Sequence, residues 1–222
     1  NVIMMPRYFI WTIGCQMNKA ESQRIAGYLD SAGYQATTSF READLIVLNT
    51  CVVRQSAEDK VLGTLELLKG LKKKRPNLSI LVTGCFVDSD IEGLRRRFPQ
   101  VDFFFKPGAY PELIDWAQGQ GIPVAEQGLL RFPFTMFRAS TYHNDTRETP
   151  SPCAFVPIIQ GCDNFCSYCI VPYRRGREIS RPVKEIVCEV EEMVRRGVKE
   201  VTLLGQNVDS YGHDLPGKPD LA

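Results

Sequence analysis

The chain has 222 residues, a formal net charge of +1 and 44% hydrophobic residues, a composition typical of globular proteins. This charge gives no overall attraction to nucleic acid, and no apolar run reaches the roughly 18 residues of a membrane helix. The N-terminus lacks the basic and apolar pattern of a signal peptide, so we expect a cytoplasmic protein without membrane association. In such a protein the eight cysteines are not expected to form disulfides.

The first part of the chain alternates strand-like and helical segments. Its apolar periodicity predicts strands at 8–13, 45–49, 79–83 and 101–105, and helices at 18–32, 56–74, 91–98 and 111–118. Asn18 is a candidate cap for the first helix, Glu21 follows as in a capping box, and Gly33 is a candidate helix end. The alternation predicts an α/β fold with an open parallel sheet and flanking helices.

The periodicity is lost after residue 125 and returns near Cys153. We expect an N-terminal α/β domain at 1–125, a linker at 126–152, and a truncated second domain at 153–222. The second domain reads as a strand at 154–160, a long loop at 161–181, a helix at 182–196 and a strand at 200–204. A single βαβ unit of this kind is too short to close a barrel.

The helix predicted at 182–196 has a simple pattern. Pro182 suits its first turn, and Gly197 is a candidate helix end. Six apolar residues share one face: Val183, Ile186, Val187, Val190, Met193 and Val194. We therefore expect this face to be buried.

Three cysteines fall within eight residues, at Cys162, Cys166 and Cys169. A cubane iron–sulfur cluster takes four thiolates, so three would leave one iron open to another ligand. A structural zinc ion is the alternative, but it needs a fourth ligand at a suitable spacing. The two histidines, His143 and His213, lie in separate predicted loops and do not match a zinc pattern.

Three further cysteines, Cys15, Cys51 and Cys85, each follow a predicted parallel strand. Such positions meet at one edge of an open α/β sheet, where ligands bind. The alternative for each is a small buried thiol with a packing role. For the two remaining cysteines, Cys153 and Cys188, we expect that packing role.

The spacing of Cys162, Cys166 and Cys169 resembles the radical S-adenosylmethionine signature. The resemblance implies that these cysteines hold a [4Fe–4S] cluster whose open iron binds S-adenosylmethionine. Tyr168 stands at the position that borders the adenine of this cofactor in the superfamily.

The resemblance extends over nearly the whole chain. Residues 14–18, 48–54 and 83–85 resemble the N-terminal domain of methylthiotransferases, and residues 161–182 resemble the start of their radical domain. Residues 205–212 resemble the MiaB-type branch, which acts on isopentenyladenosine beside the tRNA anticodon. The resemblance implies a second [4Fe–4S] cluster on Cys15, Cys51 and Cys85 that carries the sulfur to be transferred. It also places Gly205 and Gln206 near the amino group of S-adenosylmethionine.

The implied activity is the conversion of an adenine C–H bond to C–SCH3 by radical chemistry, which a cofactor must supply. The implied partners are the tRNA anticodon stem-loop, S-adenosylmethionine and an electron donor such as flavodoxin or ferredoxin. The family also implies further barrel strands and a small RNA-binding β-barrel beyond the residues in this sequence.

Four arginines crowd the segment after the cysteine motif: Arg174, Arg175, Arg177 and Arg181. Guanidinium groups suit both a carboxylate and a phosphate, so they are candidates for binding S-adenosylmethionine or tRNA. We place Arg174 and Arg175 at the cofactor. The alternative is a solvated basic loop.

Other functions remain open from sequence alone. A methylthiotransferase of this plan could act on threonylcarbamoyladenosine in tRNA or on an aspartate of a ribosomal protein. A two-cluster electron-transfer protein is a different class, although electron carriers usually bind each cluster with four cysteines. A zinc-stabilised RNA-binding module is the third alternative.

Overall fold

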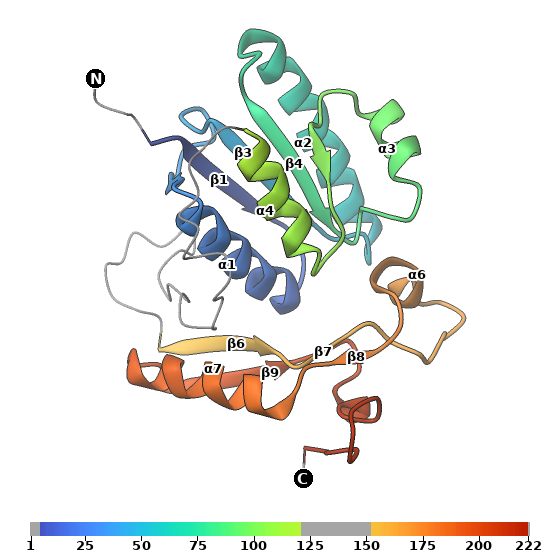
Figure 1. Ribbon diagram of the computed structural model, residues 1–222. Helices are drawn as coiled ribbons and strands as arrows, with labels where there is room; N and C mark the ends of the chain where they lie inside the picture. Colours follow the sequence, from blue (N-terminus) through green and yellow to red (C-terminus); the bar gives the residue numbers. More distant parts are fainter. Residues whose placement is uncertain (1–4, 121–151, 222) are drawn as a thin grey trace. The chain divides into compact units, whose positions relative to one another are not determined.

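The computed structural model describes residues 5–120 and 152–221, and the chain divides into two compact units (Figure 1). Apart from Pro152, the predicted linker lies outside the described residues. Within the described ranges, no helix has the length and apolar character of a membrane span.

The first unit is built on a parallel sheet of five strands in the order β2-β1-β3-β4-β5. The strands are β1 (Arg7–Thr12), β2 (Gln35–Ala36), β3 (Leu45–Thr50), β4 (Ser79–Gly84) and β5 (Phe103–Phe104). The predicted open parallel sheet is therefore confirmed. Strand β2 was not predicted because two residues carry too little periodicity to detect, and β5 is shorter than the predicted 101–105.

Helices cover both faces of this sheet. They are α1 (Gln16–Ser31), α2 (Gln55–Lys74), α3 (Ile91–Arg97) and α4 (Tyr110–Gly119). Strand β3 alternates between two cores: Leu45 and Val47 pack in the core with α1 and α4, whereas Ile46 and Leu48 pack in the core with α2 and α3. A central strand buried on both faces explains why its sequence is apolar throughout rather than alternating.

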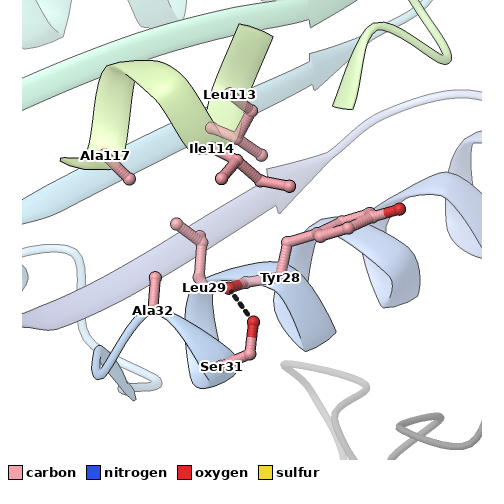
Figure 2. Close-up of a pocket in the computed structure, with 7 residues that line it drawn as sticks. All are labelled: Tyr28, Leu29, Ser31, Ala32, Leu113, Ile114 and Ala117. Carbon is pink, nitrogen blue, oxygen red and sulfur yellow. Dashed lines mark hydrogen bonds between the residues drawn. The ribbon is translucent and has the colours of Figure 1, made fainter. Parts of the chain in front are cut away.

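Helices α1 and α4 pack closely against each other. Figure 2 shows the pocket between them, where Leu29 of α1 faces Leu113 and Ala117 of α4. Its volume is about 10 Å³, which is room for about one water molecule. This packing leaves no space for a ligand between the two helices.

The second unit contains the predicted βαβ arrangement. Strands β6 (Cys153–Pro157) and β9 (Glu200–Leu204) pair in parallel, and α7 (Val183–Arg195) connects them along the chain. A short 3-10 helix, η2 (Val208–Ser210), follows β9. The core includes Val156 from β6 and Ile186 and Met193 from α7.

The single strand predicted at 154–160 is wrong, because the chain changes partner at Ile158. The N–H of Ile158 donates to the carbonyl of Leu204 (2.8 Å), while its own carbonyl accepts from the N–H of Arg181 (2.8 Å). Beyond this point β7 (Ile159–Gln160) pairs antiparallel with β8 (Ile179–Ser180). The segment predicted as a loop therefore contains β8 and a short helix, α6 (Val171–Arg175).

Helix α7 differs from its prediction in two ways. Pro182 occupies the position before the helix rather than its first turn. Ile186 and Met193 are buried as expected, but three valines of the apolar face are substantially exposed: Val183, Val187 and Val194. Gly197 does follow the helix end with a left-handed φ of +94°, as the sequence predicts.

Candidate metal centres

The first three cysteines follow neighbouring strands of the parallel sheet. Cys15 precedes α1 directly after β1, Cys51 follows β3, and Cys85 follows β4. The strand order changes direction between β1 and β3: the chain adds β2 on one side of β1, and then β3, β4 and β5 on the other side. The helices change face at the same point, because α1 after β1 covers one face of the sheet and α2 after β3 covers the other. Ligands of open α/β sheets bind at this reversal point, outside the carboxyl ends of the strands.

Two glycines show that these three loops touch. Gly14 has a φ of +137°, and a Cβ on it would lie 2.8 Å from the Cβ of Cys51. Gly84 has a φ of +92°, and a Cβ there would lie 2.2 Å from the carbonyl oxygen of Thr50. Each glycine thus permits a close approach between one cysteine loop and the next.

A pair of buried asparagines joins the loops of Cys15 and Cys51. The Asn18 amide donates to Oδ1 of Asn49 (3.0 Å) and to the carbonyl of Thr50 (2.9 Å). In return, the Asn49 amide donates to the carbonyl of Asn18 (2.8 Å) and to Oγ of Ser22 (2.9 Å). Both asparagine side chains are fully buried. This network ties the first turn of α1 to the end of β3.

The prediction that Asn18 caps α1 is therefore wrong. The helix begins two residues earlier, at Gln16, and Cys15 holds the cap position without a side-chain cap bond. Asn18 lies inside the first turn because its amide is used by Asn49 and Thr50. A local capping pattern gave way to a contact with a distant strand.

The three thiols of this set differ in access. Cys51 and Cys85 are buried, whereas Cys15 is exposed. The Cys15 thiol donates to Oδ1 of Asn18 (3.4 Å), and the N–H of Cys85 donates to the carbonyl of Thr50 (2.9 Å). The loop of Cys51 is thus bonded to the loop of Cys15 through the asparagine network and to the loop of Cys85 through the carbonyl of Thr50.

The second set lies in the segment between β7 and α6. Cys162 is buried, Cys169 is half-buried and Cys166 is exposed. The N–H of Cys162 donates to the carbonyl of Gly176 (3.2 Å), and the N–H of Cys169 donates to the carbonyl of Cys166 (2.9 Å). The loop is therefore anchored at its first cysteine and turned back on itself at its end.

Gly161 makes this anchoring possible. Its φ is +83°, and a Cβ would lie 2.0 Å from the carbonyl oxygen of Arg177. We expect Gly161→Ala to displace the cysteine loop and to cost about 1–3 kcal/mol from the forced contact, beyond the cost of left-handed backbone. Gly176→Ala is the matched control, since Gly176 has a φ of +81° and nothing within 4 Å of its Cβ position.

Hydrogen-exchange mass spectrometry of the β7–β8 and Cys162 amides measures the difference between these two variants. Faster exchange in Gly161→Ala than in Gly176→Ala is the expected result. Equal exchange in both variants would mean that Gly161 is needed only for its left-handed backbone, and not for its close approach to the carbonyl of Arg177.

Asp163, inside the cysteine motif, forms an ion pair with Arg177, which follows α6. Arg177 donates through Nε and one terminal nitrogen to both carboxylate oxygens of Asp163, at 2.8 and 3.0 Å. This fork, with the N–H of Glu178, holds the pKa of Asp163 below its ordinary value, and the same contact raises the pKa of Arg177. Both groups are charged at neutral pH.

Two of the residues expected at the cofactor, Gly205 and Gln206, contact the segment that leads into the cysteine loop. Oε1 of Gln206 accepts from the N–H of Gly161 (2.7 Å), so Gln206 contacts the start of the cysteine loop. A Cβ on Gly205 would lie 2.4 Å from the Ile159 side chain. The Tyr168 ring is 90% exposed. The cofactor contacts of Tyr168, Gly205 and Gln206 stay predictions.

The arginines after the motif are not a uniformly solvated loop. Arg175 is buried and Arg174 is half-buried, both in α6, and their cofactor role stays a prediction. Arg181 forms an ion pair with the buried Glu189 (2.6 Å) and donates to the carbonyl of Pro157 (2.5 Å). The solvated interpretation is therefore wrong for Arg175 and Arg181.

The packing role expected for the two remaining cysteines is wrong as well. Cys188 is exposed because it lies on the side of α7 that faces away from the core, and Cys153 is exposed at the start of β6. The Cys153 thiol has Oε2 of Glu200 as a distant acceptor at 3.8 Å. Neither cysteine belongs to the two sets.

Within residues 5–120 and 152–221, no three acidic, histidine or cysteine side chains are arranged to hold a single metal ion. A cubane cluster is a different case, because each cysteine binds a separate iron and the thiols lie farther apart than the ligands of one ion. Three thiols at one sheet edge, and three in one anchored loop, fit such a cluster in number and chemistry.

The comparisons with known proteins agree with this division. Residues 7–106 match the family described as Uncharacterized protein family UPF0004, and residues 156–216 match the Radical SAM superfamily. The two matches fall in the first and the second unit, respectively.

Curated relatives extend the likeness over nearly the whole chain. Proteins named tRNA-2-methylthio-N(6)-dimethylallyladenosine synthase are 48% identical over 98% of the chain in Dehalococcoides mccartyi and 47% identical over 98% in Dictyoglomus thermophilum. A protein of this name from Clostridium tetani is 43% identical over 97%. The chain covers 46%, 49% and 47% of these relatives, so it spans about half of their length.

A solved structure shares the fold. The radical S-adenosylmethionine methyltransferase TsrM from Kitasatospora setae matches with a TM-score of 0.54 and 14% identity, over 93% of this chain and 48% of that one. At this identity the likeness concerns the fold alone. It agrees with an α/β fold that leads into the start of a radical S-adenosylmethionine domain.

Proposed function

Because the chain belongs to the radical S-adenosylmethionine methylthiotransferases, we propose that the protein is a MiaB-type tRNA methylthiotransferase. Its reaction would add a methylthio group to C2 of N6-isopentenyladenosine next to the tRNA anticodon. The names of the relatives, at 42–48% identity over nearly the whole chain, support this substrate over the alternatives. Threonylcarbamoyladenosine and a ribosomal-protein aspartate remain the alternative substrates of the same chemistry.

The observation that carries the proposal is that each compact unit holds its own set of three cysteines. A set of three leaves one iron of a [4Fe–4S] cluster without a protein ligand. A two-cluster electron carrier has no need for two open irons, whereas radical cleavage of S-adenosylmethionine and sulfur transfer each need one. A structural zinc site would need a closed set of four ligands instead.

In this proposal Cys162, Cys166 and Cys169 hold the cluster that binds S-adenosylmethionine, and Cys15, Cys51 and Cys85 hold the other. The bound cofactors would supply the radical that removes the adenine hydrogen and the methylated sulfur that replaces it. The exposed Tyr168 ring is available to the adenine of S-adenosylmethionine. The half-buried Arg174 stands one turn beyond the motif as a candidate partner for its carboxylate.

The partners follow from the same reaction. The tRNA anticodon stem-loop is the proposed substrate, and a flavodoxin or ferredoxin is the proposed electron donor. Nucleoside analysis of total tRNA from a strain lacking the gene separates the substrates: loss of the methylthio group from isopentenyladenosine supports the proposal, and loss from threonylcarbamoyladenosine contradicts it.

The iron content after anaerobic reconstitution tests the two clusters directly. We expect about eight irons in the wild-type protein and about four in either triple variant, Cys15/Cys51/Cys85→Ala or Cys162/Cys166/Cys169→Ala. The double variant Cys153/Cys188→Ala is the matched control, because both thiols are exposed and lie outside the two sets. It should keep about eight irons.

About four irons in the wild type, and none after the loss of Cys162, Cys166 and Cys169, would contradict the assignment of the first set. Methylthio transfer would then lack its sulfur-carrying cluster. A colourless protein that binds zinc in place of iron would contradict the enzyme proposal as a whole.

A further inference from the structure

Three segments that are separate in sequence meet at the first cysteine of the second set. They are the start of the cysteine loop at 161–163, the segment after α6 at 176–178, and the segment after β9 at 206–207. Two of the contacts come from the backbone of the loop itself: Gly161 donates to Gln206, and Cys162 donates to Gly176. The sequence predicts roles for the cysteines, Gln206 and Arg177, but none for the side chains of Asp163 and Glu178 that also join these segments.

The centre of this junction is a reciprocal pair of carboxylates. The N–H of Asp163 donates to Oε1 of Glu178 (3.2 Å), and the N–H of Glu178 donates to Oδ1 of Asp163 (3.1 Å). Each carboxylate thus accepts a hydrogen bond from the backbone N–H of the other residue. The pattern is reciprocal, as in a helix capping box, but it joins two loop segments. The Arg177 fork on Asp163 offsets one of the two negative charges.

A third residue extends the pair to the end of β9. The Asn207 amide donates to the same Oε1 of Glu178 (3.2 Å) and to Oγ of Ser210 (2.6 Å). Glu178 Oε1 therefore accepts both from the cysteine loop and from the segment that follows β9. A single carboxylate oxygen joins the two segments of this unit that the proposed function places around the cofactor.

The hydrogen bonds of Asp163, Glu178 and Asn207 hold the N-terminal end of the cysteine loop. Cys162, next to Asp163, is buried, whereas Cys166 is exposed and Cys169 is half-buried. Exposed ion pairs such as Asp163–Arg177 contribute little to global stability. Their geometry instead fixes where the backbone of Cys162 lies relative to β9.

We propose that Glu178, together with Asp163 and Asn207, is a positioning group that holds Cys162 in place for its cluster. The proposal rests on the proposed function, in that Cys162 must be a cluster ligand. Groups that orient metal ligands through hydrogen bonds typically affect metal affinity by about ten- to a hundredfold when they are removed. Glu178→Ala removes both acceptor roles, whereas Glu178→Gln keeps a side-chain oxygen at the same place.

The test uses the Cys15/Cys51/Cys85→Ala protein, so that only the cluster on the second set is observed. After anaerobic reconstitution, the rate of iron release to the chelator ferrozine and the electron paramagnetic resonance spectrum of the reduced cluster are measured. We expect Glu178→Ala to release iron about ten times faster and to change the spectrum, and Asn207→Ala to have a smaller effect in the same direction. We expect Glu178→Gln to restore most of the slow release.

Glu192→Ala is the matched control. Glu192 is a carboxylate of the same unit that pairs with Arg195, the last residue of α7, and with Arg196, which follows it. A general loss of an acidic ion pair would affect this variant as much as Glu178→Ala. We expect its iron release and its spectrum to match those of the unsubstituted background.

The outcomes distinguish a failure of the cluster assignment from a failure of the positioning role. If the background protein holds no iron, the cluster assignment fails, and the proposed function and this inference fall together. If it holds about four irons but Glu178→Ala and Asn207→Ala both behave like Glu192→Ala, only the positioning role is overturned. The positioning role is also overturned if Glu178→Gln is as fast as Glu178→Ala. Should Glu178→Ala fail to fold, Asn207→Ala and Glu178→Gln still decide the question.

Discussion

Gly84→Ala is expected to destabilise the first unit by about 2–5 kcal/mol, the sum of a forced close contact and a left-handed backbone. The new Cβ would lie 2.2 Å from the carbonyl oxygen and 2.5 Å from the nitrogen of Thr50. Thr50 is the residue paired with Gly84 in the central strand β3, so the contacted atoms are backbone and have nowhere to move. The strand ends that carry Cys51 and Cys85 would separate.

Urea unfolding followed by tryptophan fluorescence measures this loss. The two tryptophans of the chain, Trp11 and Trp116, both lie in the first unit, so the signal reports on that unit. Gly63→Ala is the matched control, because Gly63 lies inside α2 with nothing within 4 Å of its Cβ position. We expect Gly63→Ala to stabilise the unit by about 1 kcal/mol. A Gly84→Ala midpoint equal to that of the wild type would show that the two strand ends can separate without cost.

Asn49→Asp is expected to cost about 3 kcal/mol or more at neutral pH, although the shape of the side chain barely changes. The amide of Asn49 donates to the carbonyl of Asn18 and to Ser22. A carboxylate has no donor for either partner, and burial penalises its charge. The two hydrogen bonds that Asn49 donates would be lost, whereas Asn18 would still donate to the carbonyl of Thr50.

The pH dependence of this variant has a definite sign. Burial raises the pKa of the introduced carboxyl above its value in the unfolded chain. The folded state therefore gains relative stability as the pH falls and loses it as the pH rises through the raised pKa. The difference between Asn49→Asp and the wild type should be smaller in mildly acidic buffer than at neutral pH.

Asn77→Asp is the control for Asn49→Asp, since Asn77 is exposed in the same unit. Its effect should stay within about 0.5 kcal/mol at either pH. If Asn49→Asp and Asn77→Asp had equal stability, the buried asparagine pair would make no contribution to the stability of this unit.

The sequence predicts the first unit well because its elements are periodic and long. Each of the three strands that lead to a cysteine was predicted to within a residue or two at its ends. The convergence of Cys15, Cys51 and Cys85 at one sheet edge follows from that order alone, without any knowledge of side-chain contacts. Parallel strand topology makes it predictable that these three cysteines follow the same edge of the sheet.

The interactions between loops could not be predicted in the same way. Asn18 carries a local signal for a helix cap, yet its amide bonds to Asn49 and Thr50, which lie far away in sequence. Nothing in the sequence predicts the contacts of Glu178 with Asp163 and Asn207, because such contacts between loops have no fixed spacing. The partner change at Ile158 is likewise set by β8 and β9, and not by the strand's own apolar pattern.

The sheet order also has a consequence for the sequence of events during folding. In the described part of the first unit, between residues 5 and 120, all strand pairs are parallel. Each pairing there joins segments separated by a connecting stretch, and no local hairpin nucleates the sheet. The loops that carry Cys15, Cys51 and Cys85 come together only once these pairings have formed. Cys162, Cys166 and Cys169, by contrast, are close together in the nascent chain. Under the proposed function, iron would therefore reach the second set during synthesis, whereas the first set would take up a cluster only after its unit has folded.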